Sequence, residues 1–600
     1  MQSKPIIEWT KLLGSSRYTE VNGITSGSDG FFYITGKTRE DIDGYAVGLW
    51  DAFISKFNSD GDKQWTKLLG SDVYAEGNGI ISGRDGSIYI TGRTSGDLDG
   101  QINNSVRKDD GIIQYSDAFI SKFDSDGNKE WTRLIGSNRT DFGNGIATGS
   151  DDSIYITGNT DSWDIDGKNN NAYINDRFDF LNPWDVFISK FNNDGDKQWT
   201  RLLGTSANDS ASGVSTSNDG SIYITGSTSG DLDGQTNSGL QDVFISKFNN
   251  DGDKQWTRLL GTSANDSASG VSTSNDGSIY ITGSTSGDLD GQTNSGSSDA
   301  FISKYNPDGT KDWTRLLGTS DGDHGNAITI GSDGSIYIAG STSGDLDGQT
   351  NSSSDAFTIK FDSDGNKEWA RLIGSNRTDF GNGIATGSDD SIYLYGDHSD
   401  TVYNTDGPVL VKFASNKIPT DISLSASSFN ENISAAYVIA TLTSKDKNSS
   451  DTHTYELVSG EVDTDNDSFT IDGDKLKINS SPDYETQSSY NIRLKTTDSG
   501  GLSYEEAITL SVNDLIDETP TDISLSNTSF DENIDSESVI ATLSTEDKDI
   551  GDTHTYELIS GEGDTDNDSF TIDGDKLKIN SSPDYETKSS YEIRLKTTDS

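Results

Sequence analysis

The sequence predicts an all-β chain: a seven-bladed β-propeller followed by two Greek-key β-sandwiches, the second of which is incomplete. Two observations predict this fold class. Residues 419–514 and 520–600 are near-copies of each other at an offset of 101. Seven tryptophans recur 56 to 68 residues apart in a W-T-[KR]-L-[LI]-G phrase, whose last copy has alanine for threonine: Trp9, Trp65, Trp131, Trp199, Trp256, Trp313 and Trp369. A fixed period of this kind marks the repeat as the structural unit.

Each unit of the first array contains four short phrases typical of β-strands. In the unit of Trp65 they are K-Q-W-T-K-L-L-G, G-N-G-I-I-S-G, G-S-I-Y-I-T-G and D-A-F-I-S-K-F. Runs rich in β-branched and aromatic residues, bounded by Gly, Asp and Asn, indicate a four-stranded meander. Four-stranded sheets repeated radially are propeller blades. A linear solenoid would need capping repeats, and neither end of the array differs enough to supply them.

The phase of the repeat predicts how the ring closes. The glycine-rich strand is expected innermost, because small residues fit a crowded axis, and the tryptophan strand outermost. The array begins with a tryptophan strand and ends with P-V-L-V-K-F at 408–413. Residues 8–13 are therefore expected to complete the blade begun at 382–413, which leaves no free sheet edge. The propeller is expected to span residues 1–414.

The composition excludes some partners and favours others. The net charge is −54, from 99 acidic and 45 basic side chains, so no nucleic-acid partner is expected. Such self-repulsion favours bound cations, or it serves only solubility. There is no cysteine, no apolar run long enough to span a membrane, and no secretory signal pattern in the first 14 residues. The protein is then cytoplasmic, or exported by a signal elsewhere, or this chain is part of a longer one.

The repeats resemble known families. The phrases F-x-x-D-G-x-x-x-W-T-x-L-L-G, N-G-I and D-G-S-I-Y-I-T-G resemble the bacterial SBBP β-propeller repeat over about residues 6–413. That resemblance implies a propeller and no agreed activity. The phrases S-F-[ND]-E-N-I, S-S-P-D-Y-E-T and R-L-K-T-T-D-S resemble bacterial cadherin-like repeats over about 418–600, which implies domains at 415–516 and 517–600. The second copy stops before the strand G-G-L-S-Y-E-E-A-I-T-L-S-V-N-D of the first, so we expect it to be truncated.

The cadherin-like resemblance implies Ca²⁺ as a cofactor, bound between successive domains by carboxylates of both domains and their linker. Carried over by motif, the implied ligands are Glu431, Asp483, Glu485, Asp514, Asp547, Asp549 and Asp599. The alternative is that they are exposed turn acids. The linker V-N-D-L-I-D-E-T-P departs from the family pattern, which weakens the linker ligands. The first copy has Asn448 where the second has Asp549, so a further site with Asp446 and Asp498 is less expected.

A second carboxylate set lies in D-[LI]-D-G phrases of the propeller. They either bind Ca²⁺ or form tight turns, and we favour turns because Asp-Gly is good turn chemistry and the distal Glu of an EF-hand is missing. Their acids are Asp41/Asp43, Asp97/Asp99, Asp164/Asp166, Asp231/Asp233, Asp288/Asp290 and Asp345/Asp347.

Three long connections add aromatic residues to one face of the ring. They run over 41–50, 97–116 and 161–184, and their aromatic residues are Trp50, Tyr115, Trp163, Tyr173, Phe178, Phe180 and Trp184. Such residues stack against a saccharide or protein ligand, or they pack on one another as loop cores. As ligand-binding candidates we name Trp50, Tyr115, Trp163 and Trp184.

Catalysis finds little support, and we expect no enzyme. No Ser-His-Asp arrangement, histidine metal cluster or phosphate-binding loop is recognisable, and residues 185–239 and 242–296 are identical. We expect a calcium-binding adhesion or structural protein, secreted or at the cell surface, whose propeller recognises surface proteins, glycans or a second copy. The alternatives are a carbohydrate-binding or carbohydrate-active propeller that uses the aromatic face, and an intracellular scaffold.

Overall fold

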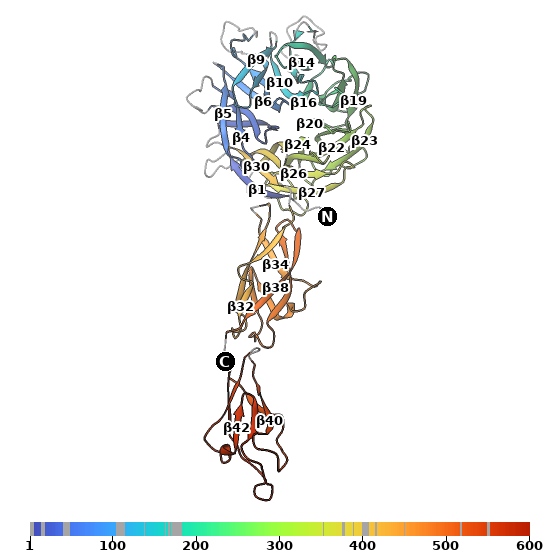
Figure 1. Ribbon diagram of the computed structural model, residues 1–600. Coiled ribbons are helices and arrows are strands. Elements are labelled where there is room, and N and C mark those ends of the chain that lie inside the picture. Colours follow the sequence, from blue (N-terminus) through green and yellow to red (C-terminus); the bar gives the residue numbers. More distant parts are fainter. Residues whose placement is uncertain are drawn as a thin grey trace. The chain divides into compact units, whose positions relative to one another are not determined.

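The computed structural model forms two compact units, Met1–Asn416 and Lys417–Ser600, and each is described by itself (Figure 1). The described residues fold into strands β1 to β44 and two short 3-10 helices. They are residues 5–13, 18–39, 49–71, 73–103, 115–136, 139–162, 164–165, 168–169, 183–351, 353–374, 379–387, 389–398, 407–414, 417–448, 451–515, 519–548 and 552–599.

Seven four-stranded antiparallel sheets make up the first unit, as the repeats predict, and they surround a central axis (Figure 1). From the axis outward, blade 1 has β2 (Thr19–Ser26), β3 (Phe32–Thr38), β4 (Asp51–Phe57) and β5 (Lys63–Leu69); blade 2 has β6 (Ala75–Ser82), β7 (Ile88–Thr94), β8 (Asp117–Phe123) and β9 (Lys129–Ile135); blade 3 has β10 (Asp141–Thr148), β11 (Ile154–Thr160), β14 (Asp185–Phe191) and β15 (Lys197–Leu203).

The remaining four blades follow the same order. Blade 4 has β16 (Asp209–Thr216), β17 (Ile222–Thr228), β18 (Asp242–Phe248) and β19 (Lys254–Leu260); blade 5 has β20 (Asp266–Thr273), β21 (Ile279–Thr285), β22 (Asp299–Tyr305) and β23 (Lys311–Leu317); blade 6 has β24 (Asp323–Ile330), β25 (Ile336–Thr342), β26 (Asp355–Phe361) and β27 (Lys367–Ile373); blade 7 has β28 (Asp379–Thr386), β29 (Ile392–His398), β30 (Gly407–Ala414) and β1 (Ile6–Leu12). A small hairpin, β12 (Asp164–Ile165) and β13 (Lys168–Asn169), lies in the β11–β14 connection.

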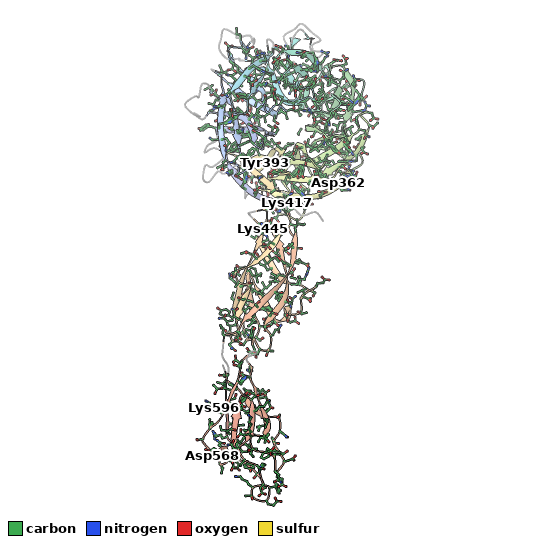
Figure 2. All side chains as sticks on the ribbon, in the orientation of Figure 1. Asp362, Tyr393, Lys417, Lys445, Asp568 and Lys596 are labelled. Atoms are coloured by element: carbon green, nitrogen blue, oxygen red, sulfur yellow. The ribbon has the colours of Figure 1, made fainter. Side chains whose placement is uncertain are left out.

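The first strand closes the ring, which confirms the predicted closure. β1 pairs antiparallel with β30, with Thr10 opposite Val411. Across the seam between blades 7 and 1, the Phe32 and Tyr393 rings stack with centres 4.6 Å apart (Tyr393 is labelled in Figure 2). The glycine-rich strands are innermost, also as predicted, and β2 contacts both β6 and β28. Blade 7 therefore joins the two ends of the first unit.

Side chains of the innermost strands link neighbouring blades. The Asn22 amide donates a hydrogen bond to the Gly77 carbonyl at 3.0 Å, and Asn78 donates to Gly143 at 2.9 Å. Within a blade, the tyrosine of each Y-I-T-G phrase packs on the following tryptophan, as Tyr33 of β3 does on Trp65 of β5 with ring centres 6.0 Å apart. Apolar cores between sheets thus carry the stability of the ring, since each fully buried large side chain contributes about 1.5–3 kcal/mol.

The second unit contains two β-sandwiches. In the first, one sheet has the order β31 (Asp421–Leu424), β33 (Val438–Lys445), β36 (Lys475–Ile478) and β35 (Phe469–Asp472), and the other has β32 (Ser428–Asn430), β38 (Ser503–Asn513), β37 (Ser489–Asp498) and β34 (His453–Leu457). The 3-10 helix η1 (Asn466–Ser468) precedes β35. Leu476, Ile478, Ile492, Leu494 and Leu510 lie fully buried between these sheets.

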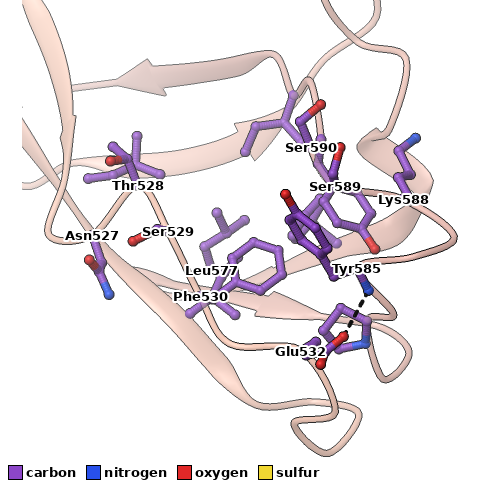
Figure 3. Close-up of a pocket in the computed structure, with 16 residues that line it drawn as sticks. Asn527, Thr528, Ser529, Phe530, Glu532, Leu577, Tyr585, Lys588, Ser589 and Ser590 are labelled. Atoms are coloured by element: carbon purple, nitrogen blue, oxygen red, sulfur yellow. Dashed lines mark hydrogen bonds between the residues drawn. The ribbon is translucent and has the colours of Figure 1, made fainter.

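The second sandwich repeats this plan in part. It has a sheet of β39 (Asp522–Leu525), β40 (Val539–Glu546), β43 (Lys576–Ile579) and β42 (Phe570–Asp573), the pair β41 (Thr555–Leu558) and β44 (Leu595–Thr598), and the 3-10 helix η2 (Asn567–Ser569). A cavity of about 450 Å³ opens beside Phe530, Leu577 and Tyr585 (Figure 3). Its lining includes Phe530 and Tyr591, whose counterparts in the first sandwich, Phe429 and Tyr490, are buried beside β38. The sandwich is thus incomplete over its described residues, as predicted.

Candidate functional site

Three carboxylates predicted as calcium ligands meet at one end of the first sandwich. Ligand atoms of Glu431, Asp483 and Glu485 lie within 4.8 Å of one another, and we call these residues the Glu431 cluster. Glu431 follows β32, and the other two stand in the turn between β36 and β37. The Glu431 carboxylate is buried and accepts the backbone N–H groups of Tyr484, at 3.1 Å, and Leu515, at 2.8 Å. It therefore fixes the D-Y-E turn against the end of β38.

The acids of the Glu431 cluster lie beside further charged groups, and the charge of Lys548 contributes to the lowered pKa of the Asp483 carboxyl. Burial and the nearby charges of Glu431 and Asp514 raise the pKa of the Glu485 carboxyl. The Glu485 Oε1 atom is buried and has no hydrogen-bond partner. Asp483 instead accepts hydrogen bonds from Thr486, which lower the pKa of its carboxyl. An orphaned buried carboxylate oxygen among three further acids fits a hard cation such as Ca²⁺.

The remaining predicted ligands belong to the second sandwich. The Asp547 carboxylate bonds to the His554 ring nitrogen Nε2 at 2.8 Å. Asp599 directly follows β44, so the structure places both at ends of strands of this sandwich. Asp549 lies outside the described residues. Asp514, by contrast, lies close enough to the first sandwich to act on Glu485.

The structure also assembles a carboxylate group that the sequence did not favour. Ligand atoms of Asp446, Asp451 and Asp498 lie within 4.8 Å of one another. His453 bonds to Asp446 at 3.2 Å, and Ser499 donates to Asp451. Burial and the charges of Asp498 and Asp446 raise the pKa of the Asp451 carboxyl. Asp451 was missed because it stands in a polar turn with no family phrase around it.

A second copy of the Glu431 cluster was also missed. Glu532, Asp584 and Glu586 lie within the same 4.8 Å, and all three are exposed. Tyr585 N–H donates to Glu532 at 3.2 Å, as Tyr484 does to Glu431. The E-N and D-Y-E phrases recur at the offset of 101, so the repeat itself was the signal that could have found this cluster.

The described D-L-D-G phrases of the propeller are tight turns, as we favoured. Leu98 and Gln101 exchange backbone hydrogen bonds, and Asp99 and Gly100 have φ angles of 53° and 74°. The Asp99 carboxylate bonds to Lys129 and Thr132. The turn thus uses its own carboxylates for local contacts, and buries its leucine between blades. The turns at Asp231, Asp288 and Asp345 repeat this arrangement, whereas Asp41, Asp43 and Asp166 lie outside the described residues.

The aromatic candidates make contacts of their own. The Arg39 guanidinium lies 4.3 Å, and the Lys37 ammonium 5.3 Å, from the centre of the Trp50 ring. Trp184 stacks on Phe142 with ring centres 5.0 Å apart. These contacts favour packing over an open stacking platform. The ring of Tyr115 is half-buried, and Trp163, Tyr173, Phe178 and Phe180 lie outside the described residues.

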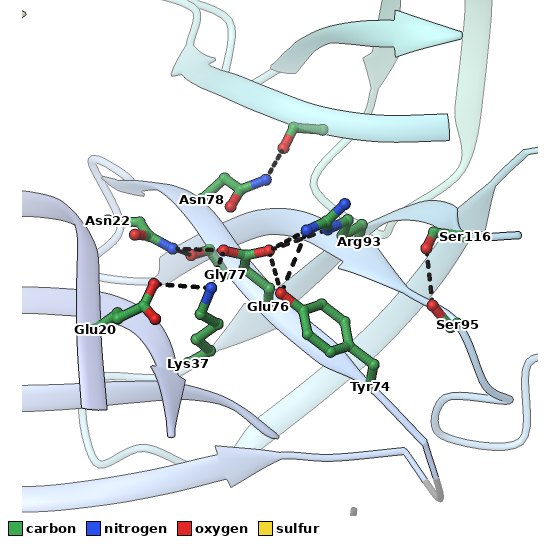
Figure 4. A network of polar contacts seen from close by, with 11 residues as sticks. Glu20, Asn22, Lys37, Tyr74, Glu76, Gly77, Asn78, Arg93, Ser95 and Ser116 are labelled. Carbon is green, nitrogen blue, oxygen red and sulfur yellow. Dashed lines mark hydrogen bonds and ion pairs between the residues drawn. The ribbon is translucent and has the colours of Figure 1, made fainter. Parts of the chain in front are cut away.

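A polar network joins blades 1 and 2 (Figure 4), and its Lys37 lies over the Trp50 ring. The buried Glu76 carboxylate accepts from Tyr74 at 2.7 Å and pairs with Arg93 at 2.9 Å and Lys37 at 3.2 Å. Lys37 also pairs with Glu20 at 2.8 Å. Burial would raise the pKa of the Glu76 carboxyl, but the Tyr74 hydrogen bond and the Arg93 and Lys37 charges lower it overall. The network is thus internally neutralised and joins two blades.

The described residues contain no helix that is long and apolar enough to cross a membrane. Four segments match the family model described as beta-propeller repeat, SBBP: residues 130–166, 198–233, 255–290 and 312–347. Each covers the outer strand of one blade and the first two strands of the next.

Two curated relatives match parts of the chain. The regulatory protein FlaEY of Caulobacter vibrioides is 29% identical over 213 residues, which is 34% of this chain and 21% of that protein. An uncharacterized WD repeat-containing protein of Acanthamoeba polyphaga mimivirus is 26% identical over 374 residues, 48% of this chain and 27% of that protein. The chain thus spans less than a third of the length of either relative.

Two solved structures align with the chain at low identity and low TM-score. The Neurospora crassa Pan2 WD40 domain aligns at 11% identity and a TM-score of 0.38, over 70% of this chain and 98% of that one. Human protocadherin-24 EC1-2 aligns at 22% identity and a TM-score of 0.23, over 30% of this chain and 86% of that one. The chain thus carries repeats that match the SBBP β-propeller model, within a ring of seven observed four-stranded blades, and two β-sandwiches follow them.

Proposed function

We propose that the chain is a calcium-binding adhesion or structural protein, in which Ca²⁺ stiffens the sandwich repeats and the propeller presents a recognition surface. The Glu431 cluster carries the proposal. It brings three acids together beside Asp514, with a buried oxygen that no protein donor satisfies. Without a cation, like charges at this spacing repel one another and destabilise the turn that holds them.

The proposed ion would be shared across the linker. Glu431, Asp483, Glu485 and Asp514 would hold it from the first sandwich and the linker, and Asp547, Asp549 and Asp599 from the second. Ca²⁺ takes about six to eight oxygen ligands, which carboxylates of both sets together with water would supply. Ca²⁺ binding would then reduce the flexibility of the linker and stiffen the pair of sandwich repeats.

The propeller would serve recognition or display, without catalysis. Its described blades repeat one framework, and the partners we propose are surface proteins, glycans or a second copy of the chain. We propose a secreted or cell-surface location, because millimolar Ca²⁺ outside cells suits ligand sets of this kind. The rings of Trp50 and Trp184 are not proposed as the recognition surface, because Lys37, Arg39 and Phe142 pack against them.

Isothermal titration of the whole chain with Ca²⁺ tests the proposal. The double variant Glu431→Gln/Glu485→Gln should lose the linker site while the fold persists. The matched control Asp472→Asn removes an exposed acid that pairs with Lys477 at 2.7 Å, outside the cluster, and should bind as the parent chain does. Equal Ca²⁺ stoichiometry in the parent chain and the double variant would refute the proposed site.

A further inference from the structure

The junctions between blades carry a second, buried set of carboxylates. Blade 4 meets blade 5 through a parallel bridge between Gln241 and Asn265, in which Asp266 N–H donates to the Gln241 carbonyl at 2.8 Å. Asp242 follows Gln241 and Asp266 follows Asn265, so the two aspartates occupy neighbouring positions on adjacent strands. Asp242 begins the third strand of its blade, and Asp266 begins the innermost strand of the next.

The same register recurs around the ring. Backbone bonds of 2.6 to 2.8 Å join the equivalent positions at six junctions. Five junctions carry two aspartates: Asp117/Asp141, Asp185/Asp209, Asp242/Asp266, Asp299/Asp323 and Asp355/Asp379. The junction of blades 1 and 2 has Asp51 beside Ala75, and that of blades 7 and 1 has Gly407 and Thr19 at the equivalent strand starts. These two junctions lack a pair of aspartates and therefore serve as controls within the same ring.

Each carboxylate of the Asp242/Asp266 pair has one satisfied and one orphaned oxygen. Asp242 and Asp266 are 0% and 1% exposed. Asp242 Oδ2 accepts the Ser238 N–H at 2.7 Å, and Asp266 Oδ2 accepts the Thr262 N–H at 2.6 Å and its hydroxyl at 2.9 Å. The Oδ1 atoms of both are buried without any hydrogen-bond partner. Asp209 and Asp299 each have the same kind of orphaned Oδ1.

A glycine makes room for this arrangement. A Cβ atom on Gly261 would stand 2.2 Å from Asp242 Oδ1, so the last residue of W-T-R-L-L-G must lack a side chain. Gly204 and Gly318 stand in the same way against Asp185 and Asp299. The repeat thus preserves a pocket for the carboxylate at each of these junctions.

Two buried carboxylates at this proximity cannot both remain ionised without a counter-charge. Among residues 183–351, no Lys or Arg side chain pairs with Asp242 or Asp266. We propose that each junction with two aspartates binds a divalent hard cation, Ca²⁺ foremost, between the paired carboxylates.

Such sites would lock neighbouring blades together and are independent of the sandwich clusters. A cation between two blades would convert a repulsion at each junction into a bridge. This role explains why Asp242 and Asp266 are buried at neighbouring positions although no Lys or Arg of residues 183–351 pairs with them. It is also separable by experiment, because all ten tryptophans lie in the propeller repeats and none follows residue 413.

The test uses Tb³⁺ as a luminescent substitute for Ca²⁺ on the whole chain, with excitation of tryptophan. Trp184 directly precedes Asp185 of the Asp185/Asp209 junction, and Trp50 directly precedes Asp51 of the junction with a single acid. We expect saturable Tb³⁺ emission that excess Ca²⁺ displaces. Asp209→Asn should lower this emission, whereas the matched control Asp51→Asn should leave it unchanged.

Two further variants complete the test. Replacing Asp141, Asp209, Asp266, Asp323 and Asp379 together by Asn should reduce tryptophan-sensitised emission to background. It should also remove the rise with Ca²⁺ of the propeller's melting temperature, followed by tryptophan fluorescence. Ala75→Asp should create a sixth pair beside Trp50 and increase the emission. Absence of sensitised emission from the parent chain, or equal emission from the five-site variant, would overturn the proposal. If Asp209→Asn and Asp51→Asn lowered the emission equally, a pair of aspartates would not be needed for binding, and the proposal would also fall.

Discussion

The carboxylate of Glu431 accepts the backbone N–H of Leu515, 84 residues further along the chain, at 2.8 Å. One side chain therefore ties the turn after β32 to the start of the linker, and its second oxygen holds Tyr484 of the D-Y-E turn. Glu431 thus connects three segments, and the Oε1 atom of the neighbouring Glu485 has no hydrogen-bond partner. Substitution of Glu431 is therefore a suitable test of cation binding at this cluster.

Replacing Glu431 by Gln should weaken Ca²⁺ binding at the Glu431 cluster. The amide keeps the shape and one acceptor but removes a charge, and a loss of about 1.4 kcal/mol corresponds to a tenfold lower affinity. We expect at least this tenfold loss in calorimetric titration. Asp472→Asn is the control, and an unchanged affinity in Glu431→Gln would exclude the residue as a ligand.

The Glu76 network should give the propeller a sharp acid dependence. The folded-state pKa of Glu76 lies below its ordinary value of 4.5, so its stabilisation is complete above that value and is lost as the pH falls through the folded pKa. Glu76→Gln should cost about 1–3 kcal/mol at pH 7, because charged hydrogen bonds are removed from Lys37 and Arg93. Denaturant unfolding should show this difference vanishing at acid pH.

The control for this prediction is Glu20, which pairs with Lys37 at 2.8 Å from a half-exposed position. Glu20→Gln should cost less than about 1 kcal/mol, as exposed pairs do. A larger effect for Glu20→Gln than for Glu76→Gln would contradict the role given to burial.

The D-L-D-G turns should matter for packing and not for cations. Leu232 is 2% exposed, so Leu232→Ala should cost about 2–5 kcal/mol, whereas Leu240→Ala, 69% exposed in the same connection, should cost almost nothing. Asp231→Asn should leave Ca²⁺ stoichiometry unchanged, because its Oδ1 accepts the Asn237 N–H at 2.9 Å. A lost ion in Asp231→Asn would revive the calcium interpretation of these loops.

Closure of the ring by β1 should be visible in hydrogen exchange. Trp9 packs between Phe32 and Tyr393, with ring centres 6.1 and 6.3 Å away. Trp9→Ala should increase amide exchange throughout residues 6–12, since this strand has no chain continuity with its blade. Trp256 occupies the equivalent position in β19, the outer strand of blade 4. Trp256→Ala should increase the amide exchange of β19 much less, because β19 follows β18 through a tight turn.

Much of the fold was predictable because the four strand phrases recur in the same order in each propeller repeat. The position of the tryptophan strand at Trp9 indicated that it completes the last blade, and Thr10 lies opposite Val411 accordingly. The buried role of Asp242 was not predictable, since an acid before an apolar run resembles an ordinary turn residue. Its partner Asp266 comes from the next repeat, and only the folded ring brings the two together.

Prediction of the candidate sites was limited in the same way, because residues far apart in the sequence come together only in the folded protein. Family phrases located Glu431, Asp483 and Glu485, which the structure brings together. Asp451 joins Asp446 and Asp498 only through the fold, and Trp184 meets Phe142 from a strand 42 residues earlier. Contacts between separate repeats depend on blade geometry, which a local pattern does not contain.

Small-angle X-ray scattering of the whole chain with and without Ca²⁺ tests the central claim most directly. The account predicts that millimolar Ca²⁺ narrows the distance distribution of the parent chain, because the sandwich linker stiffens. It predicts no such change in Glu431→Gln/Glu485→Gln, while Asp472→Asn behaves as the parent. Superimposable parent curves with Ca²⁺ and with a chelator would contradict it.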